Sequence, residues 1–221
     1  MKTSLTIPIA IIAGGVIVAL AVYASMPKTP STSTHNPSLV RPVSASDHIL
    51  GNPAAKVMIV EYSDFDCTYC KDFHDTLHQI IANMGVNGNV AWVFRHFPLS
   101  EIHPNAFSHA RAATCVAETS GNDAFWKFSN ALFANQPVDT SAYGRIASSV
   151  GISGDAFATC FSNASPAIDA RITEDRQNAL DMGAQGTPYS IILVNGKAPV
   201  VMDGAYPYDA VKKLIDEALG Q

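Results

Sequence analysis

The sequence predicts an α/β fold in which a mixed central sheet is interrupted by an all-helical insertion. Three observations lead to this prediction. A strand–helix–strand pattern opens the folded part of the chain, a long stretch of helices without strands follows, and a strand–strand–helix pattern closes it. This alternation of strands and helices is typical of α/β domains with a central sheet.

The opening pattern contains the first two strands. Residues 56–64 form a β-branched, apolar run without clean alternation, which is typical of a central strand covered on both faces. Residues 67–84 carry apolar side chains at helical spacing. Residues 90–97 form the second strand, which Pro98 ends. Two strands joined through one helix predict a parallel pair with a right-handed crossover.

The insertion covers about residues 104–183. Its helices are expected over about 104–119, after 122, around 143–150, after 153 and after 165. Residues 189–194 and 199–203 then form two strands, which Asn195 and Gly196 join as a hairpin, and residues 207–219 form a closing helix. Because the sheet needs strands from both sides, the helical stretch is expected to be a subdomain and not an independent unit.

The first 47 residues differ from the rest of the chain. Residues 5–24 are uncharged and largely apolar, and about 20 such residues can span a bilayer. Residues 1–25 are therefore expected to be a membrane anchor, with a cleaved signal peptide as the alternative. Either segment would place the rest of the chain outside the cytoplasm, at the membrane or, after cleavage, soluble in the periplasm or secreted. Residues 26–47 are rich in Pro, Ser and Thr and are expected to form a flexible stalk, so the folded domain is expected at 48–221.

Charge and length exclude some classes of protein. The formal net charge is −5 over 221 residues, whereas a nucleic-acid-binding domain would present a basic surface. The length suits one domain with a targeting segment. The four cysteines then become the main candidates for chemistry.

Cys67 and Cys70 form a CxxC motif between the first strand and the first helix. Unpaired N–H groups at a helix N-terminus stabilise a thiolate, so Cys67 is expected to be the exposed attacking thiol and Cys70 the buried resolving thiol. An inert structural disulfide and a metal site remain as alternatives. A zinc site usually needs a second CxxC motif or a histidine pair, and haem attachment needs histidine at the position of Lys71.

Four motifs together resemble the DsbA-like branch of the thioredoxin superfamily. They occur in the family's order over about residues 48–219: the strand and motif EYSDFDCTYC at 61–70, FRHFPL at 94–99 with HPN at 103–105, the helical insertion, and GTP at 186–188. The resemblance implies a thioredoxin fold, no cofactor, and a CxxC pair that oxidises or exchanges disulfides in exported proteins.

The resemblance also implies roles for individual residues. Pro188 would be a cis-proline against the active site, and the backbone of Thr187 would pair with the substrate chain. Glu61 would lie beneath the disulfide and assist proton transfer at the buried cysteine, because a desolvated carboxyl has a raised pKa. Relatives with a second disulfide, together with the even cysteine count, favour a structural bond between Cys115 and Cys160 over two buried free thiols.

Some residues near the motif need separate interpretation. His96, His103 and His109 are expected to line the surface around the active-site face, and no metal site is expected. Thr68 and Tyr69 stand where many relatives carry Pro, His or Gly, and Asp66 adds a negative charge beside Cys67. These departures indicate a less oxidising cysteine pair.

The leading hypothesis is a monomeric thiol–disulfide oxidoreductase that acts on exported polypeptides with cysteines and exchanges electrons with a membrane partner of the DsbB or VKOR type. A disulfide isomerase or reductase is one alternative, although the stalk is too short for the dimerisation domain of dedicated isomerases. A peptide-binding chaperone that keeps the thioredoxin scaffold is the other alternative. No nucleic-acid partner is expected.

Overall fold

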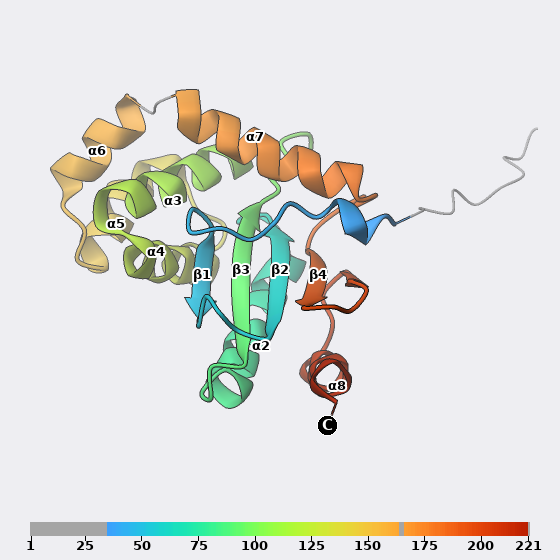
Figure 1. Cartoon of the computed structure of the whole chain (residues 1–221). Coiled ribbons are helices and arrows are strands. Elements are labelled where there is room, and N and C mark those ends of the chain that lie inside the picture. Colours follow the sequence, from blue (N-terminus) through green and yellow to red (C-terminus); the bar gives the residue numbers. More distant parts are fainter. Residues whose placement is uncertain (1–34, 164–165, 221) are drawn as a thin grey trace, which may run out of the picture. The chain divides into compact units, whose positions relative to one another are not determined.

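The computed structural model describes residues 35–163 and 166–220 (Figure 1). The expected membrane anchor at 1–25 and the first part of the expected stalk lie outside these residues. In the described part of the chain, no helix has both the length and the hydropathy that a membrane span requires.

Five strands form one mixed sheet in the order β1-β3-β2-β4-β5. β2 (Val57–Ser63) and β3 (Val90–His96) are parallel and are joined through α2 (Thr68–Met84). The edge strands and β4 run antiparallel to their neighbours; they are β1 (His48–Gly51), β4 (Tyr189–Val194) and β5 (Val200–Asp203). The mixed α/β fold is confirmed. β1 was not predicted, because four residues are too short to show a strand period.

The insertion is helical, as predicted. Figure 1 shows α3 to α6 beside the β1 edge of the sheet, while α7 crosses near one end of the strands. α8 packs against α2 and β2. The remaining helices and two 3-10 turns are η1 (Pro37–Leu39), α3 (Ala106–Ser120), α4 (Asn122–Ala134), η2 (Thr140–Ala142), α5 (Tyr143–Ser149), α6 (Gly154–Ser162), α7 (Pro166–Asp181) and α8 (Tyr208–Leu219).

Both faces of β2 are buried because its side chains enter two hydrophobic clusters. Val57 and Ile59 join a cluster that includes α2, α8 and much of the insertion. Val60 and Tyr62 join a second cluster that contains Met182, just after α7. This double burial explains the unbroken apolar run in the sequence.

Residues 35–47 pack against the domain, although the sequence analysis expected a flexible stalk there. The Arg41 backbone N–H donates to Asn178 Oδ1 at 2.9 Å. Asp47 is buried and accepts from Arg95 Nε at 3.0 Å. The folded unit therefore begins before residue 48. Composition did not reveal this, because Arg41 and Asp47 find their partners far along the chain.

Candidate active site

Cys67 and Cys70 lie where β2 leads into α2. Cys67 has extended backbone and is the N-cap residue, and Cys70 lies in the first turn of the helix. Both thiols are free. The backbone N–H of Asp64 donates to Cys70 Sγ at 3.5 Å. The short connection after β2 therefore holds both sulfurs at the start of one helix.

Cys67 is less exposed than the sequence analysis expected. Its exposed fraction is 6%, and Cys70 is fully buried. The Cys67 thiol donates to the backbone carbonyl of Thr187 at 3.5 Å, so the segment before β4 covers part of the sulfur. Only tertiary packing brings that segment, 120 residues away in sequence, over the motif.

The two thiols differ strongly in acidity. A hydrogen bond from the Cys70 thiol, assisted by backbone N–H groups at the helix start, lowers the pKa of Cys67 from 9.0 to about 6. Burial raises the pKa of Cys70 well above its ordinary value. At neutral pH, Cys67 is therefore mostly a thiolate and Cys70 remains protonated, so the pair has one nucleophile and one protected thiol.

The Thr187–Pro188 bond is cis and leads directly into β4. Pro188 is buried, and its carbonyl accepts from the Gly204 N–H at 2.9 Å. The Thr187 carbonyl faces Cys67. A backbone acceptor therefore stands beside the nucleophilic sulfur, as a site for an extended peptide would require.

Glu61 is a fully buried carboxyl on β2, a central strand of the sheet. Burial raises its pKa to about 8. The Trp92 indole N–H donates to Glu61 Oε2 at 2.9 Å, and the Glu61 carboxylate contributes to the raised pKa of Cys70. A proton-carrying group therefore lies close to the buried thiol.

Asp66 is engaged by the helical insertion. Its carboxylate accepts from His109 Nε2 at 2.9 Å, and the other ring nitrogen of His109 lies 2.5 Å from the Tyr143 hydroxyl. With the proton on Nε2, the ring accepts from Tyr143 and donates to Asp66. The carboxylate of Asp66, the residue directly before Cys67 in sequence, is thus hydrogen-bonded to the insertion through His109.

The three histidines do not form one group. His103 Nδ1 lies 2.9 Å from Asp64 Oδ2, and His109 contacts Asp66, so both border the motif. His109 and His96 are each 1% exposed, so the expected surface position was wrong for both. His96 contacts Thr114 Oγ1 at 3.0 Å. Its place at the end of the buried strand β3 explains the burial.

Gln136 is a site residue that sequence reasoning missed. It follows α4, and its side-chain N–H groups donate to the backbone carbonyls of Phe65 at 2.5 Å and Cys67 at 3.3 Å. The insertion therefore holds the backbone of the CxxC loop directly. The sequence carried no signal for this contact, because about 70 residues separate the partners.

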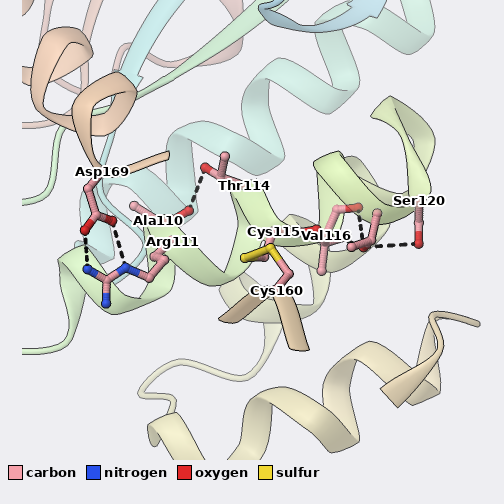
Figure 2. Close-up of a disulfide and its surroundings, with 9 residues drawn as sticks. Ala110, Arg111, Thr114, Cys115, Val116, Ser120, Cys160 and Asp169 are labelled. Carbon is pink, nitrogen blue, oxygen red and sulfur yellow. Dashed lines mark hydrogen bonds and ion pairs between the residues drawn. A yellow bond between two sulfur atoms is a disulfide. The ribbon is translucent and has the colours of Figure 1, made fainter. Parts of the chain in front are cut away.

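The other two cysteines form a disulfide within the insertion. Cys115 of α3 and Cys160 of α6 are bonded, with their Cα atoms 5.7 Å apart (Figure 2). Figure 2 also shows Arg111 of α3 paired with Asp169 of α7, with a 2.8 Å bond from Nε. α3 is thus linked to α6 by a disulfide and to α7 by an ion pair, and none of these residues is close to the CxxC motif in sequence.

Known proteins share the sequence pattern. The family model described as thioredoxin matches residues 44–217. Curated relatives include a Na(+)/H(+) antiporter NhaA 1 of Mycolicibacterium gilvum, 33% identical over 161 residues, which are 72% of this chain and 25% of that protein. An NhaA 1 of Salinispora arenicola is 30% identical over 177 residues, 78% of this chain and 24% of that protein. The chain thus spans about a quarter of the length of these curated relatives.

Solved structures share the fold. Wolbachia pipientis α-DsbA1 matches with a TM-score of 0.70 and 24% identity, covering 83% of this chain and 96% of that one. BdbD from Bacillus subtilis matches with a TM-score of 0.66 and 25% identity, covering 79% and 94%. With its sheet order, its helical insertion, its CxxC motif at a helix start and its family match, the chain belongs to the thioredoxin family and has a DsbA-like thioredoxin fold.

Proposed function

We propose that this protein is an extracytoplasmic thiol–disulfide oxidoreductase that forms or exchanges disulfides in exported polypeptides. The observation that carries the proposal is the unequal acidity of two cysteines one helical turn apart, with the pKa of Cys67 lowered to about 6 and that of Cys70 raised. A purely structural disulfide gains nothing from a lowered thiol pKa, whereas thiol–disulfide exchange requires a thiolate.

The proposed reaction begins with the Cys67–Cys70 disulfide. A substrate thiolate attacks Cys67 Sγ, a new S–S bond forms, and Cys70 leaves with the electron pair of the old bond. The second substrate thiolate then attacks the substrate sulfur of this mixed disulfide, and Cys67 leaves as a thiolate. The substrate loses two electrons and the cysteine pair gains them.

The local groups suit these two steps. Glu61, with its pKa raised to about 8, holds a proton at neutral pH and can give it to the departing Cys70 sulfur. The low pKa of Cys67 makes it a good leaving group in the second step. The Thr187 carbonyl, which precedes the cis-Pro188, would accept a hydrogen bond from a backbone N–H of the substrate.

The lowered pKa of Cys67 suits thiol–disulfide exchange in either direction, and the reduction potential of the pair decides the direction. A reduction potential near about −120 mV would assign an oxidase, and one near about −270 mV a reductase. If the protein is an oxidase, a membrane partner of the DsbB or VKOR type would reoxidise the Cys67–Cys70 pair after each cycle.

The proposed location is outside the cytoplasm, anchored through residues 5–24. The apolar run supports it, as does the Cys115–Cys160 bond, because disulfides persist in oxidising compartments. N-terminal sequencing of the mature protein tests the anchor, and a chain that begins at Ser25 would contradict it. Ion transport by the antiporter relatives is not part of the proposal, since the match spans only a quarter of each.

Trapping a mixed disulfide tests the chemistry. Oxidised Cys70→Ser protein, capped at Cys67 with a small thiol, is incubated with a reduced polypeptide that contains a single cysteine. The expected product is a covalent adduct at Cys67, because neither Cys70 nor a second substrate thiol is present to release it. Cys67→Ser is the matched control and should form no comparable adduct. A higher adduct yield through Cys70 than through Cys67 would refute the assignment of roles.

A further inference from the structure

Two imidazoles and one amide oxygen meet between α2 and α4. His74 and His78 are four residues apart on α2, so their rings lie on the same side of that helix. Their Nε2 atoms are 3.1 Å apart. Asn130 Oδ1 of α4 lies 2.7 Å from His74 Nε2 and 2.8 Å from His78 Nε2. Three electron-pair donors therefore converge on one point.

Hydrogen bonds alone do not satisfy all three contacts among the two rings and the amide oxygen. Asn130 Oδ1 accepts from both rings only if each carries its proton on Nε2, and two N–H groups then face each other at 3.1 Å. If one Nε2 is unprotonated, it can accept from the other ring, but its lone pair then also faces the amide oxygen, a second acceptor, at 2.7 or 2.8 Å. A cation that accepts all three lone pairs removes this conflict.

The surroundings suit a metal ion. The three groups line a pocket of about 650 Å³ together with Asp75 and Lys71. The pocket leaves room for water ligands beside the three donor atoms.

We propose that His74, His78 and Asn130 bind a divalent transition-metal ion that prefers imidazole, with Zn²⁺ as its representative. Zn–N bonds of about 2.0–2.1 Å place two nitrogens of a tetrahedral site about 3.3–3.4 Å apart. The two Nε2 atoms are already 3.1 Å apart, and Asn130 Oδ1, at 2.7 and 2.8 Å from them, has to move away by about 0.5 Å when the ion binds. Within the described residues no three His, Cys, Asp and Glu side chains gather as a metal site, so the amide is an essential part of this one. The sequence analysis expected no metal site, and this proposal is independent of the proposed dithiol chemistry.

Calorimetric titration of the 221-residue chain with Zn²⁺ tests the proposal. The protein is used with Cys67 and Cys70 oxidised to a disulfide, so that their thiols do not compete for the metal. One site of micromolar or tighter affinity is expected. His78→Gln should weaken binding by at least about tenfold. His78 is only half-buried, so the variant should fold, and its far-UV circular dichroism checks this.

His35→Gln is the matched control. It removes another histidine, whose ring lies near Tyr189 and Asp203 and far from the cluster in sequence. Zn²⁺ affinity should not change. Absence of Zn²⁺ binding in the unsubstituted chain, unchanged affinity in His78→Gln, or equal loss in His35→Gln would each overturn the proposal.

Asn130→Asp provides a test in the opposite direction. Residue 130 is exposed, so the change is compatible with folding, and it replaces a weak amide ligand by a carboxylate. Zn²⁺ should bind at least about tenfold more tightly, which a merely structural role of Asn130 does not predict. Unchanged or weaker binding would overturn the proposal.

The two tryptophans of the chain offer an independent readout. Trp92 lies with its ring centroid 5.0 Å from His74 and 5.3 Å from His78, and Trp126 lies 6.5 Å and 6.3 Å away. Cu²⁺ added to the oxidised protein should quench tryptophan fluorescence at one equivalent. The quenching should be lost in His78→Gln and kept in His35→Gln, and any other pattern counts against the site.

Discussion

The two cysteine pairs of this protein occupy contrasting regions. Cys67 and Cys70 are three residues apart at the start of one helix, next to a buried carboxyl and a peptide carbonyl from another segment. Cys115 and Cys160 are 45 residues apart and join two helices of the insertion. The same side chain is thus suited to exchange in one region and to cross-linking in the other, because its position in the fold sets its acidity, its access and the length of loop that it closes.

The largest expected effect is on exchange activity, which should depend on Cys67 and not on the Cys115–Cys160 disulfide. Cys67→Ser should reduce disulfide exchange with a reduced peptide to the uncatalysed rate, because no other thiol at the site has a lowered pKa. The double variant with Cys115→Ser and Cys160→Ser should keep most of the activity at a temperature where it is folded. The rate of peptide oxidation measures both. Loss of activity in the double variant would make the second pair part of a redox relay.

Glu61 should make stability depend on pH. Its pKa rises from 4.5 to about 8 on folding, so the folded state holds the proton more tightly than the unfolded state. The stabilisation is complete below about pH 4.5 and is lost as the pH rises through 8. Relative to Glu61→Gln, the oxidised protein should lose on the order of 4–5 kcal/mol of unfolding free energy across that range.

Urea unfolding of the oxidised proteins at pH 4.5, 6 and 8 measures this difference. Glu101→Gln is the control, because that carboxylate pairs with Arg176 at the exposed surface. A parallel pH dependence for Glu61→Gln and the unsubstituted protein would show that Glu61 titrates normally.

The insertion disulfide should contribute stability of a similar size without pH dependence. It closes a loop that spans 45 residues, for which chain entropy gives at most roughly 4 kcal/mol. Changing both Cys115 and Cys160 to Ser should lower the melting temperature by up to roughly 10 °C. Calorimetry measures the shift, and an unchanged melting temperature would mean that the bond is not a structural cross-link.

The smallest expected effect tests whether the two regions cooperate. Gln136→Ala removes the hydrogen bonds from the insertion to the carbonyls of Phe65 and Cys67. A loss of about 1 kcal/mol corresponds to an exchange rate about fivefold lower. Asn135→Ala is the neighbouring control, since the Asn135 side chain donates to the Ala131 carbonyl of the preceding helix and not to the CxxC loop. Equal rates for both variants would show that the insertion does not position the loop.

The sequence by itself determined the order of the elements and the identity of the redox motif. Periodicity located α2, the parallel strands and the helical insertion, because burial on one or two faces leaves a repeat in the chain. The CxxC spacing and its place at a helix start predicted Cys67 as the nucleophile, since both depend on residues close together in sequence. The residues that border it, Thr187, Pro188 and Glu61, came from the family resemblance and not from periodicity.

Only the tertiary structure decided the environment of those residues. The contact of Thr187 with Cys67, the hydrogen bonds of Gln136 and the pairing of Asp66 with His109 all join partners more than 40 residues apart. The packed segment 35–47 and the convergence of His78 with Asn130 have the same origin. Such contacts leave no local pattern in the chain, because they depend on how the insertion and the sheet pack together and not on the period of any one element.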